Sequence, residues 1–154
     1  SAASDVYKRQ VMRTIIQRVT SASVDVDGKT VGRIGTGFLI LVGFTDGDTE
    51  ADCIRIAKKI GGLRIFSDEN DKINLSLADV GGEILCISQF TLYADCTHGY
   101  RPSFIKAARP ETAQPLYDFF CTELEKYAHT ERGIFGADMK VSLLNDGPFT
   151  VMIE

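Results

Sequence analysis

The feature that most restricts how this chain can fold is a short segment, residues 38–44 (FLILVGF), that is apolar at every position. Its length is that of a strand, and it falls far short of the roughly 18–20 apolar residues that a bilayer span needs. A strand that is apolar on both faces has to be covered on both faces. We therefore predict that residues 38–44 form a central strand with packed layers on either side.

Other segments have the β-branched composition or the alternation of strands. They are residues 14–19, 23–26, 29–34, 63–66, 83–91, 141–144 and 149–153. Asp27-Gly28, between the second and third of these, predicts a two-residue hairpin turn because both residues tolerate a positive φ. Residues 67–82 are polar with a weak apolar rhythm, which predicts a loop with one turn of helix.

Two segments have helical periodicity. In residues 49–60, Thr49 is the expected N-cap and Gly61-Gly62 the expected stop. The apolar face of this helix consists of Cys53, Ile56, Ala57 and Ile60. The second helix is predicted over residues 112–128, with a start no earlier than Thr112 because Pro115 is tolerated only in the first turn.

Two helices cannot cover both faces of so many strands, so some of the sheet has to pack on itself. The predicted fold class is α+β: one domain with three mixed layers, β/β/α, and barrel-like packing of the sheet. The 154 residues fit one domain, which we assign to residues 12–154. Residues 1–11 have no periodicity and no apolar region of a secretory signal. We interpret them as a disordered leader or tag before a native start at Met12, and an ordered N-terminal strand is the alternative.

Charge and cysteine usage limit the partners and the compartment. The 17 Lys and Arg against 21 Asp and Glu give a net charge of −4, which argues against a protein that coats nucleic acid through its phosphates. If RNA is the substrate, the contact has to be short and local. The four cysteines form no CxxC pair, so reduced thiols in a cytoplasmic protein are expected.

The common catalytic and metal-binding motifs are missing. Ser88 does not lie in a G-x-S-x-G elbow, and the loop residues Asp95 and His98 do not by themselves make a catalytic triad. The spacing of Cys86, Cys96 and His98 matches no common zinc pattern. We therefore expect neither a metal nor a cofactor.

Two segments carry more chemistry than their surroundings. Residues 88–94 (SQFTLYA) follow a predicted buried strand and supply hydroxyl, amide and ring in succession. On an extended backbone Gln89 and Thr91 would share a face and form a polar wall of a cleft, and a plain polar strand edge is the alternative. Residues 145–150 (NDGPFT) predict a turn between two strands, where glycine would let bare backbone approach a ligand.

Together these segments resemble the signatures of the bacterial-type D-aminoacyl-tRNA deacylase family, whose members remove D-amino acids wrongly esterified to tRNA. The family pairs a SQFTL stretch with an N-x-GP-x-T stretch, found here at residues 88–92 and 145–150. MRTIIQRV (12–19), GYRPSF (99–104) and GIFGADM (133–139) add to the resemblance, which covers residues 12–154 in order. Phe149 departs from it, since valine is commoner there.

The resemblance implies a homodimer in which each subunit lends a cis Gly147-Pro148 to the partner's pocket. The carbonyls of this pair would accept the amino group of the substrate and leave no room for an L side chain, so glycyl-tRNA would also be cleaved. Arg18 matches the arginine that holds this loop. Phe135 and Met139 match positions that line the site for the terminal adenosine, and core packing is the alternative for both.

The resemblance also implies a catalytic site for ester hydrolysis, with the expected residues Ser88, Gln89, Phe90 and Thr91. Main-chain N–H groups near Phe90 and Thr91 would stabilise the oxyanion, assisted by the ribose 2′-OH of the substrate. No His or Lys in the motif can activate Thr91, so it is predicted to orient the substrate rather than attack it. The expected partners are a second copy of the chain and the aminoacylated 3′ end of tRNA, without a membrane or DNA.

Three alternatives remain open at this point. One is a module that binds RNA ends without catalysis. Another is a relative with a trans Gly-Pro that accepts some L-aminoacyl-tRNA. The third is a dimeric structural protein.

Overall fold

The computed structural model describes residues 11–154, so the expected leader lies outside the described residues except for Val11. In chain order the elements are β1 (Arg13–Val26), β2 (Lys29–Ile34), β3 (Gly37–Gly43), α2 (Glu50–Gly62), β4 (Phe66–Ser67), β5 (Ile73–Leu75), α3 (Leu77–Val80), β6 (Glu83–Ser88), the 3₁₀ helix η1 (Phe90–Tyr93), α4 (Pro110–Leu124), β7 (Thr130–Arg132) and β8 (Lys140–Ile153). A six-stranded sheet has the order β2-β1-β3-β6-β7 with β8 also paired to β1, and β4 and β5 form a separate two-stranded sheet.

The predicted central strand is confirmed as β3, which lies between β1 and a parallel partner, β6. Its side chains alternate between two hydrophobic clusters. Phe38, Ile40 and Val42 face α2 and α4, whereas Leu39 belongs to a second cluster on the opposite face of the sheet. The complete apolarity of this segment is therefore explained by burial on both sides.

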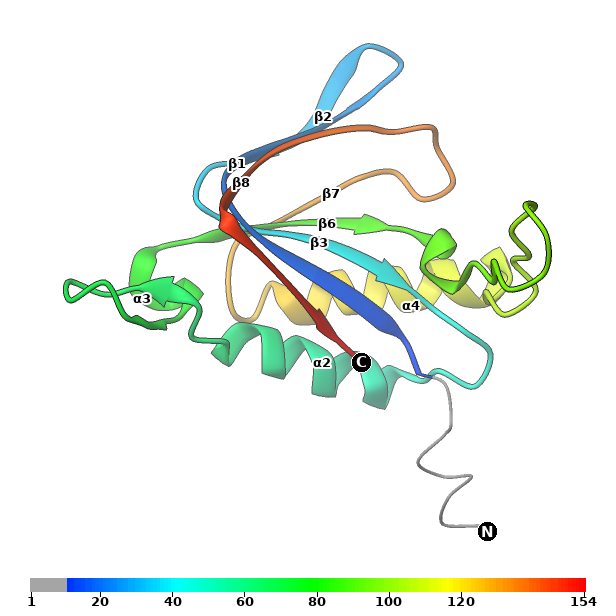
Figure 1. Cartoon of the computed structure of the whole chain (residues 1–154), viewed down its shortest axis with the longest axis horizontal. Coiled ribbons are helices and arrows are strands. Elements are labelled where there is room, and N and C mark those ends of the chain that lie inside the picture. The colour runs from blue at the N-terminus through cyan, green and yellow to red at the C-terminus, as the bar shows by residue number, and fades with distance from the viewer. Residues whose placement is uncertain (1–10) are drawn as a thin grey trace, which may run out of the picture.

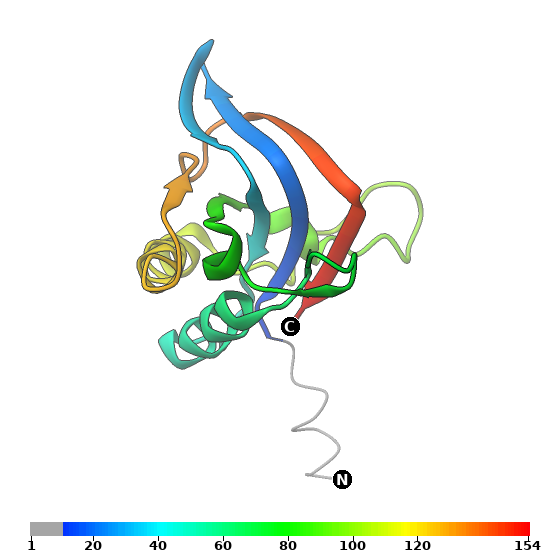
Figure 2. The ribbon, with the colours of Figure 1, turned by 90° about the vertical axis from the view of Figure 1, so that its left-hand side faces the viewer.

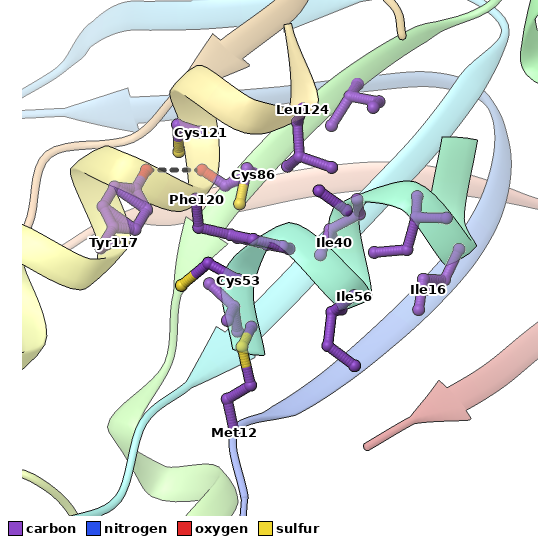
Figure 3. Packing of buried hydrophobic residues seen from close by; sticks show 14 of the residues in the cluster. Met12, Ile16, Ile40, Cys53, Ile56, Cys86, Tyr117, Phe120, Cys121 and Leu124 are labelled. Carbon is purple, nitrogen blue, oxygen red and sulfur yellow. Dashed lines mark hydrogen bonds between the residues drawn. The ribbon is translucent and has the colours of Figure 1, made fainter. Parts of the chain in front are cut away.

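The helical layer packs on one face of the sheet, as Figure 1 shows below β3 and β6. Figure 3 shows the core between these layers, where the Tyr117 hydroxyl of α4 donates a hydrogen bond to the Cys86 carbonyl of β6 (2.7 Å). Phe120 is fully buried in the same core. None of the helices within residues 11–154 has the length and apolar character needed to cross a bilayer.

The second β layer forms because the sheet curls over itself (Figure 2). β2 approaches β6 and β7 so closely that a Cβ on Gly32 would lie 3.0 Å from the Arg132 carbonyl oxygen and 3.2 Å from Leu85 Cδ1. The second cluster, which includes Val24, Ile34 and Leu85, fills the space enclosed by this curl. The α+β class, the β/β/α layers and the barrel-like sheet are thus confirmed.

β1 is longer than predicted. Residues 14–19 and 23–26 were expected as two strands, but they belong to one 14-residue strand. One edge of β1 pairs first with β3 and then with β2, while the other edge pairs with β8 along most of its length. The predicted hairpin turn is confirmed, with φ of 50° at Asp27 and 77° at Gly28.

The helix boundaries differ from the prediction mainly in α4. α2 begins after Thr49, whose side chain and Asp52 form a capping box, but it includes Gly61 and Gly62 instead of stopping before them. The expectation that the second helix starts no earlier than Thr112 was wrong, since Pro110 occupies its first position. A proline there needs no N–H partner, and the helix accommodates Pro115 further on.

The smaller elements were predicted only in part. α3 is the single helical turn expected within residues 67–82, capped by Ser76. The predicted strand at 63–66 overlaps β4 only at Phe66. β7 was missed because its three residues, Thr130–Arg132, have no apolar pattern; parallel pairing with β6 makes them a strand.

Candidate functional site

A cavity of about 330 Å³ opens where β3 and β6 end. Its walls are largely apolar and include Phe44 after β3, Phe104 in the following loop and Ala113 on α4. Three of the four expected catalytic-site residues, Ser88, Gln89 and Phe90, also line it, as does Phe135 from the expected adenosine site. Such a concave apolar site with a few polar groups is typical of a small-ligand pocket.

The polar rim of the cavity results from a break in β6. The strand was predicted to run through residue 91, but it ends at Ser88, and Phe90–Tyr93 form the 3₁₀ helix η1. The last ladder contact is the hydrogen bond from Gln89 N to Val42 O (2.7 Å). The pairing of β6 with β3 ends at Ser88, and the chain then turns across the end of β3.

Gln89 and Thr91 lie together, although not for the predicted reason. The strand alternation invoked for them does not exist here; the 3₁₀ turn brings the Gln89 Nε2 amide to donate to Thr91 Oγ1 (2.5 Å). The partner of the Thr91 hydroxyl is thus an amide N–H, which is a donor and cannot take a proton. The first N–H groups of a short helix have no partner within that helix, and in η1 these belong to Phe90 and Thr91.

Phe90 stands at the mouth of the cavity. The residue is 55% exposed, and its ring meets the Phe104 ring edge-on at 5.1 Å between centroids. Phe104 was quoted in the GYRPSF stretch but was not predicted as a site residue. Its only sequence signal is its place in that stretch, because Tyr100 and Ile105 make the same loop apolar at other positions as well.

Residues 145–150, which we call the elbow, bulge out of β8 and do not reverse the chain. The predicted turn between two strands was wrong, because Thr150 pairs with Gln17 and Asn145 with Val19 on the same strand, β1. Residues 146–149 therefore bulge opposite a single β1 residue, Arg18. The Gly147–Pro148 peptide bond is cis, as the resemblance implies, and Gly147 has a φ of 138°.

Side chains of the elbow hold its shape from within. Asn145 Oδ1 accepts a hydrogen bond from Phe149 N (2.7 Å), and Asn145 Nδ2 donates to Thr150 Oγ1 (2.9 Å). The asparagine thus bridges the two ends of the bulge. Gly147 and Pro148 remain exposed at its tip.

Arg18 fixes the elbow to the rest of the molecule. Its Nε donates to the Asp146 carbonyl (2.9 Å) and its Nη1 to the Ile65 carbonyl (2.6 Å). The guanidinium also lies over the Phe149 ring, 4.8 Å from the centroid. A planar fork with several donors suits this arrangement, which a lysine could not reproduce. Arg18 thus joins the elbow to the segment after α2, and its role in substrate selection stays a prediction.

The elbow does not line the cavity of its own chain. Arg18 pairs with Phe38, whereas the cavity begins at Val42, which is four strand residues or roughly 13 Å farther along β3. The structure therefore brings Ser88, Gln89 and Phe90 together at one place, and Arg18, Gly147 and Pro148 at another.

The two residues expected at the adenosine site lie in different surroundings. Phe135 lines the cavity, and its ring is 6.1 Å from that of Tyr117. Met139 is not among the cavity residues; it packs against the second hydrophobic cluster, with its sulfur close to Gly133.

The remaining nucleophilic and metal-binding side chains lie away from this chemistry. Cys53, Cys86 and Cys121 are buried in the core, and Cys96 is exposed in a loop. Burial raises the pKa of the Cys53 thiol to about 12, so its reactive thiolate is suppressed. Within residues 11–154, no group of three or more His, Cys, Asp or Glu residues could hold a metal ion.

The sequence of the chain is similar to those of a known family. A family model described as D-Tyr-tRNA(Tyr) deacylase matches residues 15–154. Proteins named D-aminoacyl-tRNA deacylase from Bacillus cytotoxicus and Lactobacillus acidophilus are each 56% identical over 144 residues, or 93% of this chain and 99% of theirs.

Two solved structures have the same fold. One, described as c-Myc DNA Unwinding Element Binding Protein, has a TM-score of 0.85 and 39% identity, covering 92% of this chain and 97% of that one. Another, described as a probable eukaryotic D-amino acid tRNA deacylase, has a TM-score of 0.80 at 20% identity, covering 94% and 99%. The second likeness concerns the fold alone.

Proposed function

The chain belongs to the D-Tyr-tRNA(Tyr) deacylase family, and from this premise we propose how its cavity and elbow act together. It is a D-aminoacyl-tRNA deacylase, a hydrolase of the ester bond between amino acid and tRNA. The aminoacyl end of the substrate enters the cavity at Ser88, Gln89 and Phe90. The N–H groups at the start of η1 stabilise the oxyanion that forms on the ester carbonyl.

The elbow completes the cavity of a second copy of the chain in a homodimer. The observation that supports this most is that Gly147 and Pro148 are exposed and held by Arg18, yet do not line the cavity of their own chain. β8 also exposes Leu144 (61%) and Met152 (60%) on either side of the elbow. An exposed apolar strand of this kind is typical of a surface that another subunit covers.

The elbow selects the handedness of the substrate by crowding. Its backbone presents carbonyl groups without a side chain at Gly147, so it accepts the amino group of a D-aminoacyl ester while an L side chain would collide with it. Rejection by a fixed backbone needs no gain of affinity for the correct substrate. Glycine has no side chain to reject, so glycyl-tRNA is also a substrate.

Water is the attacking nucleophile, positioned with help from the ribose 2′-OH next to the ester. Thr91 does not attack, because its hydroxyl is paired with the Gln89 amide and no base lies beside it in the motif. Thr91 and Gln89 instead hold the substrate in line with the oxyanion donors.

The proposal is tested with three substrates under one set of conditions. D-tyrosyl-tRNA, L-tyrosyl-tRNA and glycyl-tRNA are incubated with the enzyme, and the remaining ester is measured over time. We expect rapid loss of the first and third and no acceleration for the second. Equal loss of all three would remove the argument from handedness, and no loss of any would indicate an RNA-binding module without catalysis.

Thr91→Ala should lower kcat for D-tyrosyl-tRNA by about tenfold, since a lost orienting hydrogen bond is worth roughly 1–1.5 kcal/mol. Thr91→Ser keeps the hydroxyl and should retain most of the activity. Single-turnover deacylation separates this effect from binding. Complete loss in Thr91→Ala, with fold and binding intact, would indicate covalent catalysis by Thr91 and contradict the proposed role.

A further inference from the structure

A basic groove lies along the solvent-facing side of α2 and has no part in the site described so far. It has a volume of about 460 Å³ and is lined by Arg55, Lys58, Lys59, Gly62, Leu63 and Arg64. We call it the α2 basic groove. It contains four cations and no acid among its lining residues, in a chain whose net charge is −4.

The helix period gathers these cations on one side. Arg55, Lys58 and Lys59 are spaced i, i+3 and i+4, which puts them on one helix face, while the opposite face, with Ile56 and Ile60, is buried. The acids of α2, Glu50 and Asp52, lie in its first turn. The last two turns therefore carry positive charge toward solvent.

Two of the four cations, Arg55 and Arg64, interact with acidic side chains, Arg55 with Asp52 and Arg64 with Asp79. Its Nη2 lies 3.8 Å from Asp52 Oδ1, and its Nη1 donates to the Glu154 carbonyl (3.4 Å). Arg64 is oriented by the neutral Asn74, through its carbonyl (2.9 Å) and its side-chain oxygen. The Asn74 contacts orient the guanidinium, and its charge helps to lower the pKa of the nearby Asp79 carboxyl.

The α2 basic groove is joined to the elbow. A second groove of about 480 Å³ shares Lys59 and Leu63 with it and extends to Phe149 at the end of the elbow. Arg18 connects the same regions, since it donates to Ile65 just after the groove and to Asp146 in the elbow. Wherever the elbow docks, the α2 basic groove lies beside it.

We propose that the α2 basic groove binds phosphates near the acceptor end of the tRNA whose aminoacyl group lies beside the elbow. This inference rests on the proposed function, in which that aminoacyl group occupies the partner subunit's cavity. One chain then supplies the elbow and the phosphate contact, and the other supplies the cavity. Phosphate contacts position a nucleic acid without reading its sequence, so the groove suits an enzyme that acts on many tRNAs.

The double variant Lys58→Gln/Lys59→Gln tests this role without touching the cavity or the elbow. We expect KM for D-tyrosyl-tRNA to rise roughly tenfold at low salt with kcat unchanged. The slope of log KM against log salt should fall by about 1.5, since each phosphate contact contributes roughly 0.7–0.9 to it. The D-tyrosyl ester of adenosine, which has no phosphate, should be cleaved as by the wild type.

A matched control removes the same charge elsewhere. Lys29→Gln/Arg33→Gln changes two exposed cations of β2, which lies at the opposite end of the molecule from α2 in Figure 1. It should leave KM and the salt slope for D-tyrosyl-tRNA unchanged, so a general effect of net charge is separated from a local contact.

Each outcome decides between the hypotheses. A higher KM for D-tyrosyl-tRNA in the α2 double variant alone, with unchanged cleavage of the adenosine ester, supports phosphate binding by the groove. Wild-type KM in that variant, equal losses on both substrates, or an equal effect of the β2 control would overturn it. If the wild type cleaves neither D-tyrosyl ester, the proposed function fails, and that result is distinct from all of these.

Discussion

Gly147→Ala should lower kcat/KM for D-tyrosyl-tRNA by about 100-fold in a protein that still folds. Gly147 has a φ of 138°, which L residues rarely adopt, and an added Cβ would lie 3.0 Å from Phe149 N and 3.1 Å from Arg18 Nη2. The elbow has to shift to relieve both contacts. A displacement of about 1 Å in a positioning group is enough for a loss of this size.

The matched control for this variant is Gly28→Ala. Gly28 also has a positive φ, 77°, but a Cβ there would meet nothing within 4 Å. Both variants should lose about 1–3 kcal/mol of unfolding free energy through backbone strain, measured by urea denaturation. Only Gly147→Ala should lose deacylation, and equal activity of the two variants would contradict the role given to the elbow.

Gly37→Ala should lower the free energy of unfolding by 4 kcal/mol or more, on the order of the most severe single substitutions. A Cβ on Gly37 would lie 1.8 Å from the Glu83 carbonyl oxygen and 2.6 Å from Glu83 N. These are backbone atoms of β6, so no side chain can swing away. Gly37 and Glu83 are the first registered pair of the parallel β3–β6 ladder, which therefore has to separate at that end.

Gly62→Ala is the comparison variant, and it should raise the free energy of unfolding instead of lowering it. Gly62 is in the last turn of α2, and a Cβ there would meet nothing within 4 Å. Alanine is favoured over glycine in a helix by about 0.5–1 kcal/mol, so this variant should be more stable than the wild type. Urea titration of both variants makes the test, and a Gly37→Ala protein within 1 kcal/mol of the wild type would refute the close-approach argument.

The parts of the fold that follow from local chemistry were predictable. Residues 38–44 could only be a strand covered on both faces, and Asp27-Gly28 could hardly be anything but a tight turn. The Thr49 cap and the periodic apolar residues after it located α2. In each case a single physical requirement, such as burial, positive φ or helix capping, is readable in a few adjacent residues.

The parts that depend on distant partners were not predictable. Residues 14–19 and 23–26 form one strand because β8 pairs across the polar stretch between them, and that pairing leaves no local pattern. β7 exists only because β6 offers an open edge. The elbow was expected to be a turn because its composition is that of a turn, and only the shared partner strand shows that the chain continues in the same direction.

The candidate site was predicted in its residues more than in its geometry. Ser88, Gln89 and Phe90 do line one cavity, but the strand alternation used to place Gln89 beside Thr91 is replaced by a 3₁₀ turn. Phe44, Phe104 and Ala113 complete the walls from three separate segments. Their convergence is a property of tertiary packing and leaves no signal in spacing.

The bulge in β8 makes the protrusion of the elbow independent of the register of the sheet around it. Because residues 146–149 face one β1 residue, while Asn145 and Thr150 remain in register, a residue gained or lost within the bulge would alter how far it protrudes without shifting either flanking ladder. Substrate preference at this position can therefore diverge by small changes in length, and the sheet that carries it need not be redesigned.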